Sequence, residues 1–207
     1  MAVANAGSSG ARSAVARAGV LQRLRADTHA AHLRVETATG LPESVRTVEG
    51  YGRFLELLLA LHDAVEARLA APAWRDAFSD LGVDLAAHRR SQFLVADLAH
   101  LSVVARPCAT LPPVLNSFDA ALGCLYVVEG SALGGQVLAP AIDKALPGVP
   151  TSFLRGRGRR QPAAWLAVRT ALERHAEQGG SASDVVDGAL STFAVFGEQL
   201  DRSRWSA

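Results

Sequence analysis

Apolar residues recur at intervals of three and four along most of the chain from about residue 20 onward. In the first such stretch, over about 20–38, the positions Leu24, Thr28 and Ala31 show this spacing. It places apolar side chains on one face of a helix, whereas no stretch shows the strict alternation of a half-buried strand. We therefore predict an all-α fold, a single-domain bundle of about seven to eight helices.

Glycine, proline and capping residues mark where these helices end. Gly40 ends the first helix, Thr47 offers an N-cap to a long second one, and Gly82 ends a short third. Further helices are expected over about 85–104, 113–146, 163–178 and 183–202, the last with a cap at Ser181. The stretch 148–162 holds two prolines, three glycines and four arginines, and we expect it to be a loop.

The first twenty residues differ from the rest of the chain. They are rich in Ala, Gly and Ser, contain Arg12 and Arg17, and have no acidic residue. We expect residues 1–19 to form a disordered tail before a helical domain at 20–207. A targeting peptide of similar composition is the alternative.

Composition excludes several classes of protein. The 207 residues carry 21 Lys and Arg against 20 Asp and Glu, whereas a dedicated nucleic-acid-binding protein needs surplus basic surface. Cys108 and Cys124 form no Cys-x-x-Cys pair, which excludes a zinc ribbon and a disulfide framework and favours a reducing cytoplasm. No uninterrupted apolar run approaches the roughly 20 residues of a membrane span. We expect a soluble, cytoplasmic protein that binds neither nucleic acid nor membrane.

The first helix carries a candidate metal ligand. Thr28, His32 and Glu36 are spaced i, i+4 and i+8, so they lie along one stripe. An imidazole binds a metal better when its second nitrogen donates to a carboxylate, and Thr28 is placed to help orient the ring. Two alternatives stay open: His32 as an ordinary surface or core histidine, and a mononuclear metal site formed with His29 and Glu36.

The apolar stretch around residue 130 contains three glycines within six residues, Gly130, Gly134 and Gly135. Each costs about 1 kcal/mol relative to alanine inside a helix, so a compensating role is expected. Glycine lets a backbone approach a large flat group, which a planar cofactor would supply. Close helix–helix packing through Gly130-x-x-x-Gly134 is the alternative, although it leaves Gly135 unexplained.

Two motifs together resemble the haem oxygenase family, most closely its bacterial biliverdin-producing branch, which often serves bacteriophytochromes. They are Leu24-Arg25-x-x-Thr28-x-x-x-His32-x-x-x-Glu36 and Leu125-Tyr126-Val127-x-Glu129-Gly130-Ser131-x-Leu133-Gly134-Gly135. The order of the expected elements agrees from about residue 20 to 200. The resemblance implies a haem-oxygenase-like bundle with haem between the first helix and the glycine-rich helix.

The resemblance also implies roles for individual residues. His32 matches the proximal iron ligand and Glu36 the residue that polarises it. Gly130, Ser131, Gly134 and Gly135 match the catalytic distal helix. Arg25, Thr28 and Tyr126 match residues that contact haem, and Arg169 is a weaker candidate for binding a propionate. Phe193 and Phe196 match residues in the wall of the pocket. Animal-type members carry an aspartate where this chain has Ser131, which leaves the proton donor unassigned.

The implied activity is oxidative cleavage of haem, as both substrate and cofactor, to biliverdin, CO and Fe2+. O2 is the oxidant, and electrons come from a separate ferredoxin or reductase, because the chain has no flavin or nicotinamide motif. A bacteriophytochrome is the implied recipient of biliverdin. A non-enzymatic haem-binding or haem-trafficking protein on the same fold is the alternative, which Ser131 keeps open.

Several charged residues are expected to lie on the solvated surface. They include His88 and His175, for which no role is predicted, and the basic loop of Arg155, Arg157, Arg159 and Arg160. A docking patch for an acidic electron donor is the alternative interpretation of that loop.

Overall fold

The computed structural model describes residues 19–103, 112–201, 203 and 205, and all regular structure within them is helical. The elements are α2 (Val20–Thr39), α3 (Val48–Leu69), α4 (Pro72–Asp80), α5 (Leu85–His88), α6 (Ser91–His100), α7 (Phe118–Ala145), α8 (Ser152–Arg155), η1 (Gly158–Arg160), α9 (Gln161–Glu177) and α10 (Ala182–Gln199). Seven of these helices in the described ranges have nine residues or more, which confirms the predicted all-α class. The predicted tail falls almost entirely on residues 1–18, outside the described ranges.

Local side chains cap the long helices as expected. Thr47 Oγ1 accepts a hydrogen bond from the Gly50 N–H at 3.0 Å, and Ser181 Oγ accepts one from the Asp184 N–H at 3.3 Å. Gly40 ends α2 in the left-handed conformation, with φ 60°. These caps satisfy backbone groups that a helix end leaves without an intrahelical partner.

The predicted helix over 85–104 is wrong, because the chain breaks between α5 and α6. The Glu66 carboxylate of α3 accepts hydrogen bonds from the N–H groups of Arg90 (2.7 Å) and Ser91 (2.9 Å). Burial raises the pKa of Glu66, but the adjacent His62 and these donors outweigh it and lower the pKa to about 2. A carboxylate from a different helix therefore starts α6.

The predicted loop at 148–162 also contains helical structure. Asp97 of α6 accepts hydrogen bonds from the N–H groups of Ser152 (3.1 Å) and Phe153 (2.9 Å), and so caps the short helix α8. The next long helix, α9, begins at Gln161, with Pro162 in its first turn. The capping of α8 depends on a contact between segments far apart in the sequence, whereas Pro162 favours the start of α9 locally.

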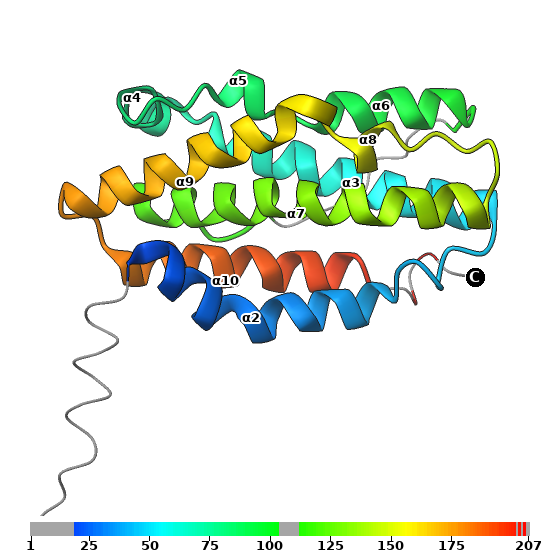
Figure 1. The fold of residues 1–207 in the computed structure, drawn as a ribbon, viewed down its shortest axis with the longest axis horizontal. Coiled ribbons are helices and arrows are strands. Elements are labelled where there is room, and N and C mark those ends of the chain that lie inside the picture. The colour runs from blue at the N-terminus through cyan, green and yellow to red at the C-terminus, as the bar shows by residue number, and fades with distance from the viewer. Residues whose placement is uncertain (1–18, 104–111, 202, 204, 206–207) are drawn as a thin grey trace, which may run out of the picture.

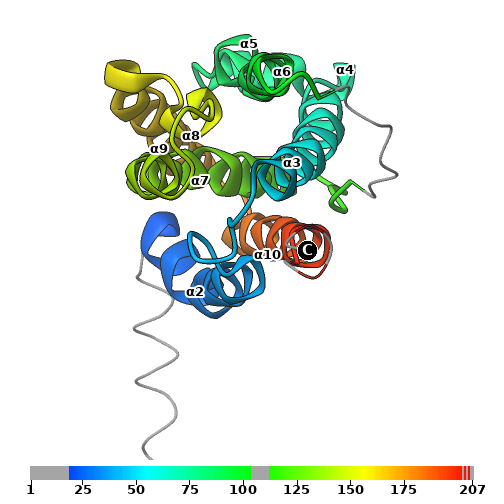
Figure 2. The same cartoon turned by 90° about the vertical axis from the view of Figure 1, so that its right-hand side faces the viewer.

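Helices α2 and α10 lie side by side along one face of α7 (Figures 1 and 2). The α7–α10 contact is between backbones: a Cβ on Gly123 would lie 1.9 Å from the Val185 carbonyl oxygen, and one on Gly188 would lie 2.2 Å from that of Ala120. Helices α3, α8 and α9 pack around the rest of α7, which is therefore the central helix of the bundle, and α6 packs outside it on α3 and α8.

Helix α7 is long and apolar enough to cross a membrane by length and composition alone. Within the described structure, however, 56% of its most apolar window is buried against the other helices. The fully buried carboxylate of Glu129 also lies within it. Its apolar character is accounted for by its central position in the core.

Candidate functional site

A cavity of about 560 Å³ separates α2 from the middle of α7. This volume is in the ordinary range for small-molecule and cofactor sites. Its walls are mainly apolar, from the side chains of Val35, Leu41, Phe54, Leu58, Val127, Leu133, Leu138, Phe153, Leu154, Trp165, Phe193, Phe196 and Leu200. All the residues named in the two sequence motifs line it except the core positions Leu24, Leu125 and Glu129, and the separately predicted Arg169 lies outside the lining. The fold thus brings together two motifs about a hundred residues apart.

His32 faces this cavity from α2. Its Nδ1 lies 3.6 Å from Glu36 Oε1, and its ring packs edge-on against the Phe193 ring, with 5.7 Å between the ring centroids. With Nδ1 turned toward a carboxylate, Nε2 is the nitrogen left to bind a metal. Thr28 lines the cavity one turn before His32, and its hydroxyl donates to the Leu24 carbonyl oxygen at 2.7 Å, so its role in orienting the ring stays a prediction.

The three glycines in the middle of α7, Gly130, Gly134 and Gly135, have different surroundings, and the helix continues through all of them without a break. No atom lies within 4 Å of a Cβ added at Gly134, and one added at Gly130 would only touch Trp165 at 3.8 Å. At Gly135, in contrast, the added Cβ would lie 2.7 Å from the Leu154 carbonyl oxygen of α8. Packing through Gly130-x-x-x-Gly134 is therefore wrong: these two border open space, and Gly135 makes the close packing contact.

Ser131 is held in one orientation beside the cavity. Its hydroxyl donates to the Val128 carbonyl oxygen at 2.8 Å and accepts from Arg90 Nη1 at 3.0 Å. The Arg90 guanidinium is buried, stacks 4.1 Å above the Phe153 ring and donates to the Phe153 carbonyl oxygen at 3.1 Å. A hydroxyl has a single proton to donate, so Ser131 can only accept a hydrogen bond from a group in the cavity.

Two arginines lie near the Tyr126 phenol, one from each neighbouring helix. Burial raises the pKa of Tyr126, whereas the positive charges of Arg25 on α2 and Arg169 on α9 lower it. The Tyr126 ring packs against the Trp165 ring, with 5.3 Å between the ring centroids. Arg25 lines the cavity and Arg169 lies outside its lining, but both act on the same phenol. This end of the cavity suits a carboxylate.

Sequence reasoning missed His62, which lines the cavity from α3. The ring is fully buried, and neither nitrogen has a hydrogen-bond partner; Nδ1 lies 3.8 Å from Glu66 Oε1. Burial lowers the pKa of His62, which favours the neutral imidazole. The i, i+4 spacing to Glu66 repeats that of His32 and Glu36, and this signal was present in the sequence. An unpartnered buried imidazole indicates a polar guest in the cavity.

The surface assignments of three residues are wrong. His88 is buried, with Nδ1 3.0 Å from Glu129 Oε1. His175 is largely buried, and its Nε2 lies 2.9 Å from Asp119 Oδ1. Arg157 turns inward and pairs with Glu129.

The basic loop is therefore smaller than expected. Arg155 pairs with Asp143, and Arg157 is withdrawn from the surface. Arg159 and Arg160 remain exposed. Within the described ranges, no three His, Cys, Asp or Glu side chains are grouped to hold a metal ion, so the mononuclear site with His29 is not assembled.

The fold is that of a known group of proteins. The NO- and CO-bound heme oxygenase from Neisseria meningitidis superimposes with a TM-score of 0.71 at 22% identity, covering 90% of this chain and 92% of that one. A heme oxygenase from Xanthomonas campestris pv. campestris is 35% identical over 98 residues, which span 46% of this chain and 59% of the relative. No protein-family model matches the chain. The chain therefore has the haem oxygenase fold.

Proposed function

We propose that this chain is a haem oxygenase that cleaves haem to biliverdin, CO and Fe2+, using O2 and electrons from an external donor. The observation that carries the proposal is the cavity between α2 and α7, which presents an imidazole on one side and glycine backbone on the other. The shared fold and the local identity to a heme oxygenase support it. We assign this function to residues 20–207 as one domain.

The cavity fits a haem group in three respects. Its walls are mainly apolar, as the porphyrin faces require. The open space at Gly134 leaves room for a flat group against α7. The unpartnered nitrogens of His62 offer contacts to an ordered water or ligand inside the cavity.

The two ends of the cavity would bind different parts of the haem group. On α2, His32 would hold the iron through Nε2 while Glu36 polarises the ring through Nδ1. At the basic end, Arg25 and Tyr126 would bind the propionates, with Arg169 adding charge from α9. These contacts would fix the ring in the cavity and so determine which of its edges faces α7.

Residues of α7 would control the space beside the iron. When bound, haem supplies both the iron that activates O2 and the carbon that is oxidised. Gly130 and Gly134 allow the α7 backbone to restrict that space, and Gly135 holds α7 against α8. Ser131 would accept a hydrogen bond from a water in the cavity, and the second hydrogen of that water would remain available to donate to another oxygen there.

The remaining partners follow from the same reaction. We propose a cytoplasmic protein that takes electrons from a ferredoxin or reductase docked near the exposed Arg159 and Arg160. Dependence of the turnover rate on ionic strength tests this docking. We further propose a bacteriophytochrome as recipient of the product.

Turnover of the haem complex tests the function directly. Purified protein is loaded with haem and supplied with O2 and an electron donor, and absorption is followed. Loss of the Soret band with appearance of biliverdin is expected. A persistent ferrous–oxygen spectrum would instead identify a haem-binding protein without oxygenase activity.

Replacement of His32 tests the iron ligand. His32→Ala should abolish the spectrum of histidine-ligated haem, whereas His29→Ala, in the same cavity wall, should retain it. An unchanged spectrum in the His32 variant contradicts the assignment.

A further inference from the structure

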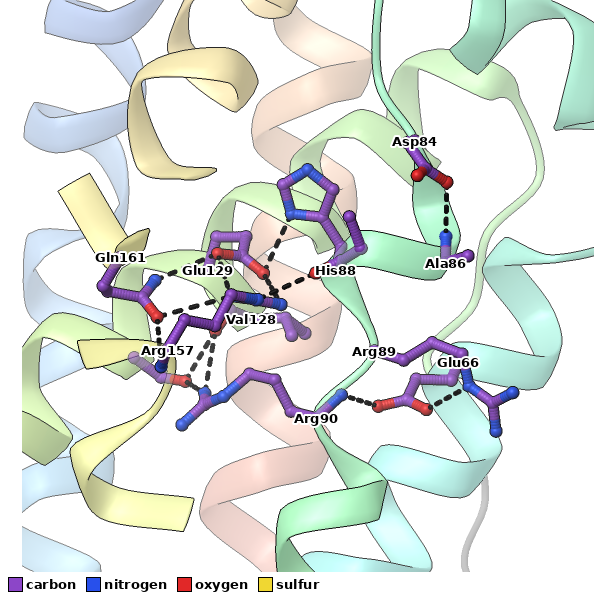
Figure 3. A network of polar contacts seen from close by, with 12 residues as sticks. Glu66, Asp84, Ala86, His88, Arg89, Arg90, Val128, Glu129, Arg157 and Gln161 are labelled. Atoms are coloured by element: carbon purple, nitrogen blue, oxygen red, sulfur yellow. Dashed lines mark hydrogen bonds and ion pairs between the residues drawn. The ribbon is translucent and has the colours of Figure 1, made fainter. Parts of the chain in front are cut away.

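Behind the cavity-facing side of α7 lies a buried ion pair that the proposed reaction does not use. Arg157 binds the Glu129 carboxylate through two hydrogen bonds, Nη1 to Oε2 and Nη2 to Oε1, each 3.0 Å (Figure 3). Gln161 Nε2 donates to Oε2 at 3.1 Å. His88 Nδ1 lies 3.0 Å from Oε1. Glu129 is fully buried, so its charge is poorly screened by solvent.

The pair lies immediately behind the cavity. Glu129 directly precedes Gly130 and Ser131, which line it. Its pKa is raised by burial, but His88 and Arg157 outweigh this and hold it below its usual range, so the carboxylate is ionised at neutral pH. The separation between this charge and a group across α7 is about one helix diameter, about 10 Å.

Other charged side chains lie beside this pair. Arg90, which bonds Ser131, and Glu66, which bonds the Arg90 N–H, extend the cluster away from Glu129 (Figure 3). The guanidinium groups of Arg90 and Arg157 thus face the carboxylates of Glu66 and Glu129, while the largely exposed Arg89 donates to Glu66 Oε2 at 3.2 Å. Within the Glu129–Arg157 pair itself, the charge of the carboxylate and that of the guanidinium cancel.

We propose that Glu129 and Arg157 are positioning residues that keep the charge behind the distal side of α7 neutral, and thereby set how strongly an anionic ligand binds the haem iron. This inference rests on the proposed function. Removing one member of the pair leaves a unit charge about 10 Å from the ligand. At an effective dielectric constant of about 20, that charge changes the affinity for an anion by about tenfold.

The test uses ferric haem complexes of the full chain and two probes, anionic azide and neutral imidazole. Glu129→Gln leaves excess positive charge and should bind azide about tenfold more tightly, whereas Arg157→Gln should bind it about tenfold more weakly. The double variant restores neutrality and should return to the wild-type azide affinity. Imidazole affinity should stay unchanged throughout.

Two further variants separate charge from packing. Arg157→Lys keeps the charge but loses the paired geometry, so its azide affinity should match wild type. Asp119→Asn breaks a partly buried pair with His175 near the start of α7 and should leave the azide-to-imidazole ratio unchanged.

The outcomes distinguish this inference from the proposed function. If azide and imidazole affinities move together, or the double variant fails to recover, the electrostatic role is refuted. Should one of the two single variants fail to fold, the other still decides, because it must shift azide affinity about tenfold while imidazole affinity stays unchanged. If wild-type protein binds no haem, the proposed function fails first.

Discussion

Two adjacent glycines of α7 provide a matched test of the site. Gly134 borders the cavity, and a Cβ added there has no atom within 4 Å. Gly135 packs on α8, where the same atom would lie 2.7 Å from the Leu154 carbonyl oxygen. Alanine at either position gains the same helix propensity, so any difference between the variants comes from the surroundings.

The expected magnitudes have opposite signs. Alanine is favoured over glycine by about 1 kcal/mol inside a helix, so Gly134→Ala should stabilise the haem-free protein by about 0.5–1 kcal/mol and raise Tm by about 1–4 °C. Gly135→Ala gains the same term but must displace α8, at a cost of about 1–3 kcal/mol. We expect it to be net destabilising by about 1 kcal/mol.

Urea unfolding followed by circular dichroism, with haem titration in parallel, measures both effects. The Gly134→Ala methyl group enters the cavity, so this variant should combine higher stability with weaker haem binding. If both variants shift stability in the same direction, the packing argument fails. Wild-type haem affinity in Gly134→Ala would place the ligand elsewhere.

Three further outcomes are expected. Because the folded-state pKa of Glu66 lies below its unfolded value, its ionised form stabilises the fold above about pH 4.5 and this contribution is lost as pH falls toward 2. Glu66→Gln should therefore lower the free energy of unfolding by about 2 kcal/mol at pH 7, and by progressively less in urea titrations toward pH 2. If the difference in free energy between variant and wild type is the same at every pH, this reasoning is contradicted. Trp205→Ala removes a buried indole whose ring centroid lies 4.7 Å from that of Phe54. In the same assay it should lower the free energy of unfolding by about 3–5 kcal/mol, and a decrease of less than about 0.5 kcal/mol would show that this contact does not stabilise the fold. Arg25→Gln should weaken haem binding about tenfold, because a charged hydrogen bond is lost. Arg34→Gln, on the same helix but outside the cavity lining, should leave haem binding unchanged. Equal effects of the two substitutions would show that Arg25 does not bind haem.

Local patterns in the sequence predicted most of the helices because their causes are local. The Thr47 and Ser181 caps act within three residues of their own chain, and the spacing of His32 and Glu36 already places both on one stripe. The same spacing joins His62 to Glu66, yet it did not single out His62. Spacing alone does not show which face of a helix is buried.

The sequence by itself determined the all-α class, the helix caps and the two motifs that meet at the cavity, because these depend on periodicity and on residues close along the chain. Only the tertiary structure decided that Glu66 begins α6, that Gly135 packs while Gly134 borders the cavity, and that Arg157 leaves the surface for Glu129. Each of these depends on a partner brought near by folding. The free-energy effect of a buried charge, or of a methyl group added to a glycine, depends on the groups that folding places beside it.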